Sequence, residues 1–223
     1  MSGNDSITVG VLALQGAFSE HLELLKKAAE QIETPKKIGF ISVKTPVDLE
    51  KCSALIIPGG ESTTMALIAE RSNILEPLRE FVKVHRRPTW GTCAGMILLS
   101  EAANRTKKGG QALIGGLSVR VNRNHFGRQV ESFDAPLDLS FLGNDEAPFR
   151  GVFIRAPIVE SILPKEECCT NASSIVAVRQ GNVVGTSFHP ELTGDLRMHK
   201  WWLGEILKDL TRREELLHAQ ENH

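Results

Sequence analysis

Apolar and polar positions alternate in blocks over the first hundred residues, in the pattern of strands separated by helices. The segment 7–14, ITVGVLAL, is almost wholly apolar and rich in β-branched residues, which is typical of a strand buried on both faces of a parallel sheet. After Gly16, apolar residues recur at spacings of three and four over 18–32, as along an amphipathic helix. Further strands are predicted at 38–43, 54–57 and just before Gly91, and helices at 62–70, 74–85 and from about Ala94. The alternation predicts a parallel sheet with helices on both faces, joined by right-handed crossovers.

The second half of the chain has short apolar runs with few helical stretches between them. Strands are predicted at 117–121, 129–133, 152–154, 174–179 and 183–188, and a hairpin turn at 180–182. A last helix begins near Asp195, a suitable N-cap, and the charged tail 211–223 is expected to fray. Because no repeat, linker or break in composition appears, we expect one α/β domain over 1–223, with its core at about 7–210. Its fold class is a three-layer, mostly parallel open sheet with an antiparallel extension in the second half.

Composition narrows the class of protein. The chain has 223 residues, with 26 Lys and Arg against 27 Asp and Glu, and a formal net charge of −1. This balance argues against nucleic acid or an anionic membrane as the main partner, because both usually bind a strongly basic surface. A hydrophobic fraction of 41% fits a packed globular protein. No apolar run approaches the roughly 20 residues of a membrane span, and the start MSGNDS is unlike a signal peptide, so a cytoplasmic protein is expected.

The four cysteines, at 52, 93, 168 and 169, do not form a metal-binding or disulfide pattern. They lack C-x-x-C spacing and nearby histidines in zinc-finger register, and adjacent cysteines make a strained disulfide. We therefore expect reduced thiols and no metal. Cys52, Cys168 and Cys169 are interpreted as packing or surface residues.

Cys93 is the exception, because it lies in the segment Gly91-Thr92-Cys93-Ala94-Gly95 between a predicted strand and a predicted helix. Glycines two residues away on either side are typical of a nucleophile elbow, where the turn is tight and backbones approach closely. A helix N-terminus beside the sulfur favours the thiolate. The alternative is a small buried apolar residue, which is what most free cysteines are.

His189-Pro190-Glu191 follows another predicted strand. Residues two apart in an extended segment project to the same side, so Glu191 can orient the imidazole of His189 while the ring faces a nucleophile. A histidine at a strand end is more often an ordinary core or surface residue. The presence of a cysteine elbow in the same chain favours the catalytic interpretation.

Pro58-Gly59-Gly60-Glu61-Ser62 lies at the carboxyl end of the third predicted strand, where open α/β sheets bind ligands. Consecutive glycines allow a peptide N–H to point into a site and stabilise an oxyanion. The alternative is a turn before a helix capped by Ser62.

Together, GGES at 59–62, GTCAG at 91–95 and FHPEL at 188–192 resemble the class I (triad) glutamine amidotransferases, which have a flavodoxin-like sheet. The segments GVLALQGAFSEH at 10–21, NRNHFGRQVESF at 122–133 and GVFIRAP at 151–157 are similar to the family of glutaminase subunits of pyridoxal 5′-phosphate synthase. The motifs extend from residue 10 to residue 192, almost the whole chain.

The resemblance implies hydrolysis of L-glutamine to glutamate and ammonia. Cys93 would attack the side-chain amide, His189 would transfer a proton to the leaving ammonia, and Glu191 would hold the imidazole. The backbone N–H groups of Gly60 and Ala94 would form the oxyanion hole.

By the family's pattern, the residues that line the glutamine pocket are Gly60, Glu61, Ser62, Arg123, Ile154 and Arg155. A zwitterionic amino acid needs an anion for its ammonium group and donors for its carboxylate, and Glu61 with an arginine supplies both. The residues do not decide whether Arg123 or Arg155 binds the carboxylate. Arg155 could equally form a structural ion pair. Gln15, in the family, belongs to the region that contacts the synthase and helps organise the oxyanion hole.

The implied partner is a separate (β/α)₈ synthase subunit, which would receive the ammonia for vitamin B6 biosynthesis and bind the sugar phosphates and the coenzyme. No cofactor is therefore expected on this chain. The segments 101–111 and 164–171 and the tail lie outside the motifs, so a partner-specific role for them stays open. Two other interpretations remain: a freestanding cysteine hydrolase of a related elbow fold, and a catalytically silent assembly subunit.

Overall fold

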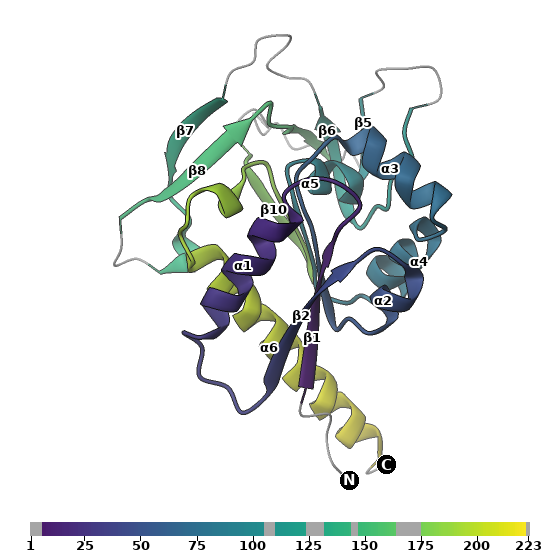
Figure 1. The fold of residues 1–223 in the computed structure, drawn as a ribbon, viewed down its shortest axis with the longest axis vertical. Helices are drawn as coiled ribbons and strands as arrows, with labels where there is room; N and C mark the ends of the chain where they lie inside the picture. Colours follow the sequence, from purple (N-terminus) through teal and green to yellow (C-terminus); the bar gives the residue numbers. More distant parts are fainter. Residues whose placement is uncertain (1–5, 105–109, 124–131, 144–146, 164–174, 222–223) are drawn as a thin grey trace.

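The computed structural model describes residues 6–104, 110–123, 132–143, 147–163 and 175–221, and its centre is a six-stranded sheet (Figure 1). The strands, in the order β10-β11-β4-β3-β1-β2, are Ala177–Gln180, Val183–Thr186, Thr89–Thr92, Ala54–Ile57, Ser6–Leu12 and Lys37–Val43. All neighbours are parallel except β10 and β11, which form an antiparallel hairpin. The predicted parallel sheet and the predicted hairpin at 180–182 are confirmed.

Helices cover both faces of this sheet, as Figure 1 shows. α1 (Phe18–Ala29) and α6 (Arg197–Glu221) pack together on one face. On the other face lie α2 (Pro46–Glu50), α3 (Ser62–Arg71), α4 (Leu75–Arg79) with a π-helical turn (Glu80–Val84), and α5 (Ala94–Leu99). The three-layer architecture is thus confirmed, and the expected helix 74–85 contains a change of helix type.

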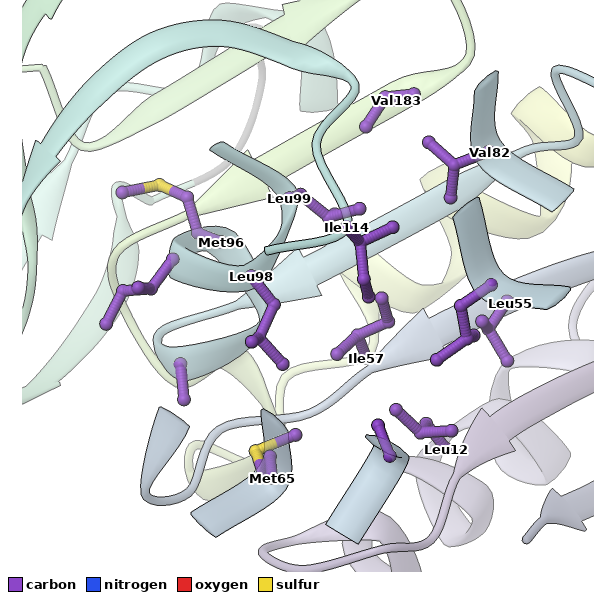
Figure 2. Close-up of a cluster of buried hydrophobic side chains, with 14 of the residues drawn as sticks. Leu12, Leu55, Ile57, Met65, Val82, Met96, Leu98, Leu99, Ile114 and Val183 are labelled. Carbon is purple, nitrogen blue, oxygen red and sulfur yellow. The ribbon is translucent and has the colours of Figure 1, made fainter. Parts of the chain in front are cut away.

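Alternation along the central strands builds the two cores. In β3, Leu55 and Ile57 face the α3–α5 side, and Ala54 and Ile56 face the α1–α6 side. All four are fully buried, as expected for a strand covered on both faces. Figure 2 shows the first of these cores, where side chains from β1, β3, α3 and α5 meet, Met65 among them.

The second half adds two small sheets, which confirms the predicted antiparallel extension. β5 (Ser100–Ala103), β6 (Leu117–Asn122) and β9 (Ile158–Ile162) form one, with β6 and β9 antiparallel. β7 (Ser132–Leu137) and β8 (Phe149–Ile154) form the other, an antiparallel pair. Short 3-10 turns lie at Ser140–Leu142 and Pro190–Leu192. Residues 129–131 and 174 of two predicted strands, residues 105–109 of the 101–111 segment and the whole 164–171 segment lie outside the described residues.

The tail beyond Thr211 was expected to fray, and in the structure it is helical as far as the last described residue, since α6 continues to Glu221. Arg213 donates to the backbone carbonyls of His85 and Arg86 and pairs with Asp209 one turn earlier, and these contacts fasten the last part of α6 to the body of the protein. Within the described part of the chain, no helix is both long and apolar enough to cross a membrane.

Candidate active site

The nucleophile candidate lies on a strained turn between β4 and α5. Cys93 has φ 48° and ψ −103°, a left-handed backbone conformation that non-glycine residues adopt only where the surroundings impose it. Its N–H donates to the carbonyl of Thr186 on β11 at 2.7 Å. Gly95 is required by close packing, because a Cβ there would lie 2.0 Å from the carbonyl oxygen of Ile57. The glycine spacing therefore serves the geometry of a nucleophile elbow.

His189 and Glu191 form a buried pair beside this turn. The imidazole Nδ1 lies 2.8 Å from Glu191 Oε1, and the two residues are 8% and 5% exposed. The expected extended segment is wrong in detail, since residues 190–192 form a 3-10 turn that brings the carboxylate back under the ring. Gly59 fits only because it lacks a side chain: a Cβ there would lie 2.3 Å from His189 Cε1.

The electrostatics of His189 favour the imidazolium. Burial alone would lower its pKa, but hydrogen bonds to Cys93 and Glu191, together with their negative charges, raise the pKa of His189 to about 10. A positively charged imidazole next to the sulfur stabilises a thiolate, which is the nucleophilic form of cysteine. The site therefore holds a nucleophile, a proton carrier and a group that orients the carrier.

A pocket of about 370 Å³ opens onto Cys93 and His189. Its wall includes nearly all of the residues predicted for the site, and its members are Gln15, Gly60, Glu61, Ser62, Cys93, Ile97, Arg123, Ile154, Arg155 and His189. Of the predicted residues, only Glu191 and Ala94 are absent from the wall. Ile97, which sequence reasoning missed, belongs to the buried face of α5. A larger hollow of about 690 Å³ lies beside the hairpin at Gly181, and no cysteine is among the described residues that line it.

Glu61 caps helix α3 and also lines the pocket. Its carboxylate accepts hydrogen bonds from the N–H groups of Thr63 and Thr64 and so caps α3, a role that the alternative interpretation of this segment gave to Ser62. Partial burial would raise the pKa of Glu61, but the hydrogen bonds from Thr64 and Thr63 lower it, so the side chain is a carboxylate. Ser62 instead donates to Gln111 Oε1 at 3.1 Å.

The two arginines of the wall differ in their contacts. Arg123 lies 3.7 Å from Glu61 and donates to Thr63 Oγ1 at 2.8 Å. Arg155 is exposed, has φ 43° and forms no ion pair with the residues that the structure describes. The structural ion pair considered for Arg155 is therefore not seen there, and both arginines line the same pocket.

Gln15 connects the first strand-to-helix turn with the glycine loop. Its Oε1 accepts the N–H of Glu61 at 2.7 Å, which fixes the orientation of the peptide between Gly60 and Glu61. This contact lies at the expected oxyanion hole. A shift of the turn at Gln15 would therefore move that peptide directly.

Two further side chains that the sequence analysis missed are His21 on α1 and His199 on α6. Both are fully buried, and His21 Nε2 lies 3.3 Å from Glu191 Oε2. The sequence carries a weak signal, since each histidine occupies a position on the apolar stripe of its helix. Among the described residues, no group of three or more His, Cys, Asp or Glu side chains is arranged to hold a metal ion.

A buried cysteine, histidine and carboxylate at the carboxyl end of a parallel sheet define a nucleophilic hydrolase-type site. The model of the SNO glutamine amidotransferase family matches residues 11–208. The chain therefore belongs to the SNO glutamine amidotransferase family.

Named relatives agree with this membership. The chain is 42% identical over 226 residues to the "Probable pyridoxal 5'-phosphate synthase subunit PDX2" of Arabidopsis thaliana, with 88% of this chain and 85% of that protein covered. It is 46% identical over 203 residues to the "Pyridoxal 5'-phosphate synthase subunit PdxT" of Pelotomaculum thermopropionicum, with 90% and 95% covered.

Solved structures agree as well. A crystal structure of a glutamine amidotransferase superposes with a TM-score of 0.72 at 41% identity, with 89% of this chain and 98% of that chain covered. The glutaminase domain of Trypanosoma brucei CTPS, with bound acivicin, superposes with a TM-score of 0.52 at 15% identity, covering 91% and 94%, and shares the fold.

Proposed function

We propose that this chain is the glutaminase subunit of a pyridoxal 5′-phosphate synthase: it hydrolyses L-glutamine to glutamate and ammonia, and the ammonia passes to a synthase subunit for vitamin B6 biosynthesis. The observation that carries the proposal is the pairing of the Cys93 elbow with the buried His189–Glu191 contact of 2.8 Å. Family membership and the names of the relatives support the same activity.

The reaction follows from the positions of these side chains. The Cys93 thiolate attacks the carboxamide carbon of glutamine, and the carbonyl oxygen becomes an oxyanion. The imidazolium of His189 protonates the leaving nitrogen, so that ammonia departs and a thioester remains. Water then attacks the thioester, His189 accepts its proton, and glutamate leaves with the thiolate restored. Glu191 keeps the ring oriented through both steps.

In this proposal the N–H groups of Gly60 and Ala94 stabilise the oxyanion, which is worth about 3 kcal/mol for one well-placed donor. Gln15 supports the proposal because it fixes the peptide next to Gly60. A synthase that contacts the turn at Gln15 would thereby adjust the oxyanion hole, so glutaminase activity would rise on docking. The partner is a (β/α)₈ subunit, the complex is cytoplasmic, and 1–223 forms one amidotransferase domain.

The glutamine carboxylate and ammonium group bind to the outer wall of the pocket. Arg123, Arg155 and Glu61 all belong to the wall of this pocket. The carboxylate of Glu61 lies 3.7 Å from Arg123. Because Arg155 has no ion pair with a described residue, we assign the substrate carboxylate to Arg155. Arg123 then holds Glu61 for the ammonium group.

Glutamate release by the chain mixed with its synthase subunit tests this function. Cys93→Ala and His189→Asn should abolish release while the variants still bind the synthase. Arg155→Ala should raise KM for glutamine more than it lowers kcat, whereas an unchanged KM would reassign the carboxylate. Full activity of Cys93→Ala would refute the proposed nucleophile. Equal rates with and without the synthase would refute activation on docking.

A further inference from the structure

Two buried histidines lie directly behind the proposed triad. His21 and His199 are both 0% exposed, and His21 Nδ1 lies 3.0 Å from His199 Nε2. The other ring nitrogen, His21 Nε2, lies 3.3 Å from Thr92 Oγ1 and 3.3 Å from Glu191 Oε2. A continuous series of side chains therefore runs from α6 through α1 to the carboxylate that holds His189.

Both imidazoles are neutral at physiological pH. Burial lowers the pKa of His21 well below its usual value, and repulsion between positive charges on His21 and on His199 or His189 would lower it further. Burial also lowers the pKa of His199 to about 3, although the nearby Asp195 carboxylate opposes the shift. Each ring therefore carries a single proton, and the position of that proton decides which nitrogen donates.

The contacts of His199 fix both tautomers. Its Nδ1 is buried and has no hydrogen-bond partner within the described residues, so a proton there would be an orphaned donor. The proton therefore lies on Nε2 and is donated to His21 Nδ1. His21 then carries its own proton on Nε2, where it donates to Thr92 Oγ1 and lies 3.3 Å from Glu191 Oε2. The opposite pair of tautomers would place a lone pair of His21 against the carboxylate.

Glu191 needs such a donor. One of its oxygens, Oε1, accepts from His189. The other, Oε2, is buried and has no hydrogen bond of good geometry from the residues that the structure describes, and His21 Nε2 lies 3.3 Å from it. The ring of Trp90 packs against both histidines, at centroid distances of 5.8 and 5.3 Å, which restricts rotation of the rings.

We propose that His21 and His199 are positioning residues, a pair of neutral imidazoles with fixed tautomers that place an N–H 3.3 Å from Glu191 Oε2 and so hold the carboxylate electrostatically for its bond to His189. The proposal rests on the proposed function, since it concerns the carboxylate of that triad. It adds two residues from helices α1 and α6, which pack against each other.

Nitrogen NMR of the intact, histidine-labelled chain tests the tautomers without a change in the site. Cross-peaks are assigned with His21→Gln and His199→Gln, and His85→Gln, an exposed position, serves as the control. We expect His21 and His199 to be protonated at Nε2 and unprotonated at Nδ1, and not to titrate between about pH 6 and 9. A proton on His21 Nδ1, or a charged ring, would overturn the proposal.

Kinetics of the complex with its synthase subunit test the consequence. His21→Leu should lower kcat about 10- to 100-fold, the value of one hydrogen bond to a charged group, with KM nearly unchanged. His21→Gln retains an N–H donor and should restore most of kcat. Equal losses in the two variants, or no loss in either, would show that His21 only fills space.

The failure of this inference is distinguishable from failure of the proposed function. An active Cys93→Ala variant would refute the triad and leave the nitrogen spectra unchanged. Inactivity of Cys93→Ala together with full activity of His21→Leu would refute the positioning role alone.

Discussion

Glu191 and Asp209 are both buried carboxylates, each 5% exposed, and they lie at opposite ends of the six-stranded sheet. Glu191 follows the carboxyl end of β11 and contacts His189 and His21. Asp209, on α6, lies near the start of the same strand, where it accepts from Asn182, Arg212 and Arg213.

The partners explain the different roles of the two carboxylates. Guanidinium and amide groups do not titrate near neutral pH, so the contacts of Asp209 persist and can only hold elements together. An imidazole can accept and release a proton during catalysis, so a carboxylate next to it can control a proton. Burial of an acid therefore does not identify a catalytic group, and the ability of its neighbours to transfer a proton does.

The largest expected effect is on kcat, and it is tested by replacing each of the two carboxylates, Glu191 and Asp209, with its amide. Glu191→Gln should lower kcat on the order of 10²- to 10⁴-fold, because the amide no longer stabilises the imidazolium and can impose the wrong ring orientation. Asp209→Asn, the matched carboxylate-to-amide control, should leave kcat within about twofold, since Asp209 makes no contact that changes between the ground state and the transition state. Glutamate release by the complexes measures both. A comparable loss in the two variants would contradict the division of roles.

A second effect concerns the protonation of His189. Since its pKa is raised to about 10, the ring should be imidazolium below that pH and lose its proton above it. Glu191→Gln removes a hydrogen bond and a negative charge, so the pKa of His189 should fall by about 1–3 units. NMR titration of the labelled ring measures the shift, with Asp209→Asn as control. An unchanged pKa in Glu191→Gln would show that Cys93 alone sets the charge of the ring.

The third effect is on stability, where Asp209→Asn should cause a larger loss than Glu191→Gln. Asp209→Asn should lower the free energy of unfolding by about 1–3 kcal/mol, because two guanidinium groups lose their buried counter-charge. Part of this loss is offset by solvent, since Arg212 and Arg213 are partly exposed. Urea unfolding followed by circular dichroism measures it. Should Glu191→Gln destabilise the protein more than Asp209→Asn, Glu191 would also be a structural carboxylate.

The same comparison shows what the sequence could predict. Cys93, His189 and Glu191 were accessible because each motif is local: two glycines flank the cysteine, and a single proline separates the histidine from the acid. His21 and His199 were not, because α1 and α6 meet only in the folded protein, and an isolated histidine on an apolar stripe has no distinctive spacing.

For the fold as well, elements with a strong local pattern were predicted, and those without one were missed. The buried strands of the parallel sheet were predicted from their apolar runs, whereas β5 (SEAA) and β9 (IVESI) are partly exposed and contain charged and polar residues, so no apolar run marks them. α2 was also missed, although Thr45 and Asp48 form a capping box there. The helical tail depends on contacts between Arg213 and distant carbonyls, which no local pattern reveals.

The smallest expected effect is the difference in unfolding free energy between substitutions of Arg212 and Arg213, the two arginines that pair with Asp209. Arg212 is 61% exposed at its side chain and pairs with Asp209, so Arg212→Ala should change the free energy of unfolding by no more than about 0.5 kcal/mol. Arg213 is 37% exposed at its side chain and also donates to the carbonyls of His85 and Arg86, where Arg86 has φ 49°. Arg213→Ala should therefore cost about 1 kcal/mol, because both carbonyls lose the guanidinium donor, although Asn182 still donates to that of Arg86. Urea unfolding of both variants measures the difference. Equal losses would mean that the charge on Asp209, and not the bonds to the turn before β4, fastens α6.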